Sequence, residues 1–129
     1  MEPGEITNEI KEFIRQYIPS VEQLEVLIFM KENSRQSWKA NDVAQRLYIN
    51  ELSALDRLTA LANDGMLKKE VADKSPPTFR YEPSSGELDG LIAKVIVAYK
   101  IKRAAMISLV YETPRDNLKT FSDAFRFNK

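Results

Sequence analysis

Apolar residues recur at helical spacing through most of this chain, and short stretches near the middle are typical of strands instead. The helical period and the capping residues at the segment ends predict helices over residues 5–17, 20–32, 42–48 and 51–64. Pro19 ends the first helix, Asn50 is expected to cap the fourth, and Gly65 supplies the left-handed residue that often follows a helix.

Three of these stretches predict a small amount of β-structure. Trp38 begins a short strand, and residues 66–71 and 78–82 are expected to form a hairpin. The loop between them contains Pro76 and Pro77, which cannot lie inside a central strand, so we expect an exposed tip. The chain is therefore expected to be mainly α with a small β-hairpin.

The C-terminal part predicts a long helix from Glu87 to Tyr111, which would span about 36 Å. A last helix, capped by Thr113, is expected to follow it. The long helix is apolar on more than one side, and a two-fold partner is the usual cover for such a surface. The expected dimer interface comprises Leu91, Val95, Tyr99 and Met106. The alternative is burial inside the chain by the first helix and the C-terminal phenylalanines.

These elements divide the chain into three parts. Residues 1–19 form an N-terminal helix, residues 20–83 a central domain, and residues 84–129 the long and terminal helices, which are expected to mediate dimerisation.

Composition narrows the chemistry. The 129 residues include neither cysteine nor histidine, which excludes disulfides, zinc-thiolate sites and the commonest general base. The acidic residues have no histidine or cysteine beside them, and no glycine-rich phosphate loop occurs. We therefore expect that the protein is not an enzyme and that it binds no metal and no cofactor. No apolar run approaches a membrane span and the start lacks a signal peptide, so a cytoplasmic protein without membrane contact is expected.

The net charge is zero, with a positive excess only in residues 83–129, which carry eight basic and five acidic side chains. A strongly basic chain would have indicated nucleic acid directly, so the assignment depends on motifs.

Residues 43–67 carry an ordered set of motifs: a short helix ending at Leu47, a turn, the polar cap Asn50, a helix with spaced leucines, and Gly65 followed by two apolar residues. This set resembles the helix-turn-helix core of bacterial winged-helix regulators such as the MarR family. Tyr48 stands where that family often has glycine.

The resemblance implies a winged helix-turn-helix with an N-terminal helix and long C-terminal helices. It also implies a homodimeric, sequence-specific transcriptional regulator of double-stranded DNA. Helix 51–64 would enter the major groove and the wing, residues 66–82, would contact the backbone.

The candidate DNA contacts follow from this placement. On the helix and its cap they are Asn50, Ser53, Ala54 and Arg57, and on the wing they are Lys68, Lys69, Lys74 and Arg80. Arg57 is the candidate base reader because arginine pairs bidentately with guanine. The alternatives are that Arg57 pairs with a nearby carboxylate and that the wing lysines only protect a strand edge.

A second class of function stays open. Helix 51–64 carries one basic and three acidic residues, which favours a winged helix that contacts another protein and binds no DNA. A small-molecule effector is also possible, since several aromatic residues lie near the C-terminus.

Overall fold

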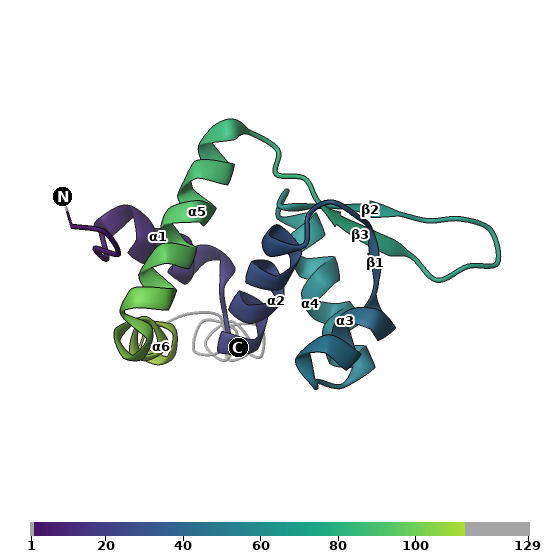
Figure 1. Ribbon diagram of the computed structural model, residues 1–129, viewed down its shortest axis with the longest axis horizontal. Coiled ribbons are helices and arrows are strands. Elements are labelled where there is room, and N and C mark those ends of the chain that lie inside the picture. The colour runs from purple at the N-terminus through teal and green to yellow at the C-terminus, as the bar shows by residue number, and fades with distance from the viewer. Residues whose placement is uncertain (1, 113–129) are drawn as a thin grey trace, which may run out of the picture. The chain divides into compact units, whose positions relative to one another are not determined.

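The computed structural model describes residues 2–112, which fold into two compact units. One unit contains residues 2–21 and 93–112, and the other contains residues 22–92. The described helices are α1 (Asn8–Tyr17), α2 (Val21–Glu32), α3 (Ala40–Leu47), α4 (Glu51–Asn63), α5 (Gly86–Ile101) and α6 (Arg103–Glu112), and the strands are β1 (Trp38–Lys39), β2 (Leu67–Glu70) and β3 (Thr78–Tyr81) (Figure 1). The expectation of a mainly α chain with a small antiparallel sheet is confirmed.

In unit 22–92, the helices α3 and α4 are joined by a short turn and pack against each other. Asn50 caps α4 as expected, because its side-chain oxygen accepts from the backbone N–H groups of Leu52 at 2.8 Å and Ser53 at 3.2 Å. Gly65 ends α4 with a φ of 83°. Helix α3 begins at Ala40, two residues before the expected start at residue 42, and Lys39 occupies its N-cap position.

The sheet has the order β1-β3-β2, so β3 is its central strand, and both pairings are antiparallel. Trp38 and Lys69 both lie opposite Phe79, and Lys68 lies opposite Arg80. Phe79 is fully buried and directs one face of the sheet into the core of the unit. The hairpin reaches out beyond α3 and α4 (Figure 1), and its loop, residues 72–77, is largely exposed.

A cluster of polar side chains ties the start of α5 to the rest of the unit. The Asp89 carboxylate accepts from Lys31 Nζ at 2.8 Å and from the Tyr81 hydroxyl at 2.6 Å. The Lys31 ammonium also lies 4.9 Å from the centre of the Tyr81 ring. These contacts join α2, β3 and α5, so the strand that leaves the hairpin is fixed to the helix that follows it.

In unit 2–21 and 93–112, Val95, Tyr99 and Met106 are buried, with exposed fractions of 0–3%. The expected dimer interface is therefore wrong for these three residues, because the chain itself covers them. Leu91, the fourth expected interface residue, is half-buried on the part of α5 that belongs to the other unit. The alternative of internal burial holds for the first three.

The expected single long helix is also wrong, because the helix bends at Lys102 and continues as α6. No proline or glycine lies between residues 91 and 112 to cause the bend. The N-terminal turn packs there: a Cβ on Gly4 would lie 3.0 Å from Ile101 Cβ, and Lys102 Nζ lies 4.0 Å from a Glu2 carboxylate oxygen. The expected last helix after Thr113 lies outside the described residues.

Among residues 2–112, none of the helices combines the length and the apolar character that a membrane crossing requires.

Replacing Asp89 with asparagine tests the polar cluster. The hydrogen bonds from Lys31 and then Tyr81 hold the Asp89 pKa below its ordinary value. The stabilising effect of the Asp89 carboxylate is therefore present above its unfolded pKa and is lost as pH falls through its folded pKa. We expect Asp89→Asn to lower the free energy of unfolding by about 1 kcal/mol at pH 7, since the pair is partly exposed. Urea denaturation should show this difference shrinking below about pH 4.

The matched control is Asp73→Asn at the tip of the hairpin, which should leave stability unchanged at both pH values. An Asp89→Asn deficit that persists undiminished in acid would contradict the role of the carboxylate charge.

Candidate functional site

One carboxylate on α2 contacts two polar side chains of α4. Arg57 Nε donates to Glu22 Oε1 at 3.1 Å, and the Ser53 hydroxyl donates to the same oxygen. The Ser53 hydrogen bond, together with the hydrogen bond and charge of Arg57, lowers the Glu22 pKa despite partial burial of the carboxyl group. Arg57 is the only cation of α4, and its side chain is 30% exposed.

The structure places the candidate DNA contacts of the helix in contacts within the unit. The alternative interpretation of Arg57, pairing with a nearby carboxylate, is what the structure contains. The expectation that Ala54 faces a groove is wrong, because Ala54 is 0% exposed in the core. Asn50 accepts the first backbone N–H groups of α4 and Ser53 donates to Glu22, so both side chains are engaged inside the unit.

The spaced leucines of α4 do not all lie on its buried face. Residues three apart on a helix differ by about 60° in direction, so a run of i+3 leucines drifts around the axis. Leu52 and Leu61 are three such steps apart and therefore lie on opposite sides. Leu61 is 0% exposed, whereas Leu52 is 71% exposed. The buried stripe is instead Ala54, Leu58 and Leu61, at spacings of four and three.

The turn between α3 and α4 presents a second exposed apolar residue. Tyr48 is 94% exposed and adopts the left-handed conformation, with φ 59° and ψ 45°. The turn thus has the backbone shape that glycine favours, although a tyrosine occupies it. This conformation costs an L-residue roughly 1–2 kcal/mol, and the side chain recovers none of that by burial.

The exposed face of the sheet is basic. Side chains alternate along a strand, so Lys68, Arg80 and Thr78 share the face opposite to Phe79, together with Lys39 and Glu70. Among the residues of the three described strands, this face carries three cations and one carboxylate, and Glu82 follows just beyond β3. Lys68 and Arg80 are direct cross-strand neighbours, an arrangement that is unfavourable for like charges.

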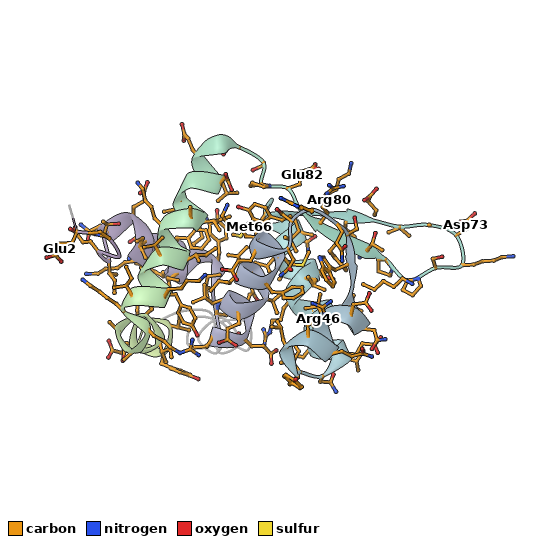
Figure 2. All side chains as sticks on the ribbon, in the orientation of Figure 1. Glu2, Arg46, Met66, Asp73, Arg80 and Glu82 are labelled. Carbon is orange, nitrogen blue, oxygen red and sulfur yellow. The ribbon has the colours of Figure 1, made fainter. Side chains whose placement is uncertain are left out.

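Two further arginines lie on the segment before β1 and on α3, and Arg46 is on the Trp38 side of the sheet, not on the exposed basic face. Arg80 donates to the backbone oxygen of Arg35 at 3.2 Å, which places the segment before β1 beside the central strand. Beside that segment, Arg35, Trp38 and Arg46 line part of a hollow of about 390 Å³. The Arg46 guanidinium stacks 5.1 Å from the Trp38 ring centre. Figure 2 shows Arg80 and Arg46 on the sheet and helix parts of this unit.

At the end of the hairpin, Lys74 is exposed and has a φ of 62°. It lies in the turn closed by the Ser75 N–H donating to Ala72 O at 3.3 Å, and its neighbour Asp73 marks the tip in Figure 2. All four wing candidates, Lys68, Lys69, Lys74 and Arg80, are exposed, with Lys69 Nζ lying 5.9 Å from the centre of the Phe79 ring.

Sequence reasoning missed two of the basic residues, Lys39 and Arg35. The alternation of Trp38 and Lys39 in an expected strand was the available signal for Lys39. The Arg35 contact depends on the pairing of β1 with β3, which the sequence does not indicate. Residues 2–112 contain no carboxylate cluster that could hold a metal ion. The chemistry that this unit offers is the binding of anions on the sheet.

The left-handed Tyr48 yields a stability prediction. Tyr48→Gly should raise the free energy of unfolding by about 0.5–1 kcal/mol, because glycine adopts this conformation without steric cost but loses more backbone entropy on folding. Tyr48→Ala should be close to neutral, since alanine meets the same strain. Chemical denaturation measures both. A clear loss of stability in Tyr48→Gly would show that the tyrosine side chain stabilises the fold.

The function of the basic sheet face and of the exposed turn before α4 is inferred from the residues that form them. Comparison with known protein families, curated proteins and solved structures finds no match for this chain.

Proposed function

We propose that residues 22–92 form a winged helix-turn-helix that binds double-stranded DNA, and that the protein is a transcriptional regulator. The wing and the exposed face of the sheet would lie on the phosphate backbone. The observation that carries this proposal is the pairing of Lys68 with Arg80 on the exposed face of the sheet, with Lys39 on the neighbouring strand.

Edge protection does not explain this arrangement. Lysines on an exposed edge strand prevent unwanted pairing, which would account for Lys68 and Lys69 on β2. Arg80, however, lies on the central strand β3, whose two edges are already paired. A cation placed there, directly opposite another cation, raises the electrostatic energy of the folded chain. An anionic ligand such as a phosphate backbone relieves that repulsion and gains affinity from it.

Helix α4 has a different role in this proposal from the one that the family resemblance implies. Its outward positions include Glu51, Leu52 and Asp56, and its single arginine is held by Glu22. Two carboxylates facing a groove lined with phosphates would weaken binding. The affinity is therefore assigned to backbone contacts of the sheet and the wing, and base reading is not assigned to Arg57.

Alanine substitutions at Lys68, Arg80 and Arg57 test this assignment. Lys68→Ala and Arg80→Ala should each weaken binding to duplexes of unrelated sequence to a similar degree, and each should reduce the slope of log K against log salt by about one. Arg57→Ala should lower stability because it leaves Glu22 without its cation, and the salt slope should stay unchanged. Fluorescence anisotropy across a salt series measures all three.

The control is Lys94→Ala, which removes an exposed lysine of the other unit that lies 3.7 Å from Glu9. It should leave DNA affinity unchanged. If the unmodified protein shows no binding near 50 mM salt, the DNA assignment is wrong, because phosphate contacts are strongest at low salt.

We further propose that the protein is a homodimer, as the resemblance implies, with a different helix face as its interface. Val97 and Ile101 lie one turn apart on α5 and are 42% and 56% exposed. A second copy packed on this helix face would cover both residues, and a two-fold axis is the commonest arrangement of two copies.

Sedimentation velocity at micromolar concentration tests the dimer. The unmodified protein should sediment at about twice the chain mass of 14.8 kDa. Val97→Glu should give monomers, because it places a charge in the apolar interface. Val71→Glu, at a more exposed apolar position on the wing, is the control and should remain dimeric. An unmodified protein that sediments as a monomer would rule the dimer out.

A further inference from the structure

The turn before α4 and the first turns of that helix form a surface that the DNA proposal leaves unused. We define the Tyr48–Leu52 surface as Tyr48, Glu51, Leu52 and Asp56, all of which are exposed. Its two apolar members lie on either side of the cap residue Asn50. Leu52 and Asp56 are neighbours on α4, because residues four apart share a helix face.

The apolar members of this surface do not contribute to folding. Tyr48 is almost wholly exposed in a left-handed conformation that disfavours it, and Leu52 is mostly exposed on a helix whose core stripe lies on the other side. Contact with a partner would explain why a large aromatic residue is exposed in an unfavourable backbone conformation. Tyrosine is enriched among the residues that dominate binding energy at protein interfaces.

The charges of this surface identify the partner. Glu51 and Asp56 flank the apolar residues, and the only cation of α4, Arg57, is neutralised by Glu22. Phosphate groups would be repelled here, whereas lysine and arginine side chains would be attracted. Charge complementarity thus selects a basic partner, and the exposed Tyr48 and Leu52 require that partner to present an apolar residue as well.

We infer that the Tyr48–Leu52 surface is a docking site for a basic, amphipathic segment of another protein. The segment places an apolar side chain against Tyr48 and Leu52 and its cations beside Glu51 and Asp56. This site is separate from the basic face of the sheet, so the chain can hold DNA and a protein partner on different surfaces. It does not depend on the DNA proposal, because its residues make none of the proposed phosphate contacts.

The test is a titration of the full-length, ¹⁵N-labelled protein with two synthetic peptides, followed by amide chemical shifts at physiological salt. One peptide alternates lysine and leucine at helical spacing, and its twin replaces every lysine with glutamate. We expect the lysine peptide to shift amides concentrated in residues 48–56 and the glutamate peptide to shift none of them. The double variant Tyr48→Asn/Leu52→Gln should bind the lysine peptide at least about tenfold more weakly.

This variant keeps every charge, and its replacements suit their positions, because asparagine tolerates a left-handed backbone and glutamine favours a helix. The matched control Val71→Gln removes an equally exposed apolar residue from the wing and should bind the lysine peptide unchanged. Shifts that map elsewhere, equal binding of the glutamate peptide, or full affinity in the double variant would each overturn the docking site.

DNA titration of the same double variant distinguishes protein docking from DNA binding at this end of α4. Unchanged DNA affinity is expected if the Tyr48–Leu52 surface docks protein. A loss of DNA affinity with unaltered stability would show that this end of α4 enters the groove, and the docking assignment would then be wrong.

Discussion

The hydrogen-bonded pairing of Glu22 with Ser53 and Arg57 is the constraint on which the interpretation of this protein depends. One carboxylate on α2 accepts from two polar side chains of α4, one turn apart, on a helix that turns Ala54, Leu58 and Leu61 into the core. Both side chains of the Glu22–Arg57 pair remain about 30% exposed, so the contact contributes modestly to stability but engages both polar groups. The position of the core stripe and the exposure of Leu52 both agree with this rotation.

With α4 rotated in this way, unit 22–92 separates its charges onto different surfaces. The outward side of α4 is acidic and apolar, whereas the exposed face of the sheet is basic. This separation makes a chain of zero net charge compatible with the proposed DNA binding, because the local field of a patch governs phosphate contacts more than the net charge does. In the two proposals, the functional classes indicated by the sequence have separate locations: anions would bind the sheet, and a basic protein segment would bind the turn and helix.

Much of the fold was predictable because its signals are local. The period of apolar residues, the Asn50 cap and the left-handed Gly65 identified the helices and the hairpin. What failed depends on long-range contacts. Leucines at i+3 spacing drift around the helix axis and so do not mark one buried face, and the contact of α4 with the distant Glu22 has no local signal. Likewise, Val95 is apolar whether the chain or a second copy covers it, and the sequence contains no break signal at Lys102.

The side-chain Nε–H resonances of the arginines provide the most direct measurement of how this unit meets DNA. Titration of ¹⁵N-labelled protein with a duplex at low salt reports Arg80 on the central strand and Arg57 on α4 in one experiment. If Glu22 retains Arg57 and the sheet carries the phosphates, the Arg80 signal should shift strongly while the Arg57 signal stays in place. A shift of Arg57 with an unaltered Arg80 would contradict this, and would show that Arg57 leaves Glu22 to read DNA.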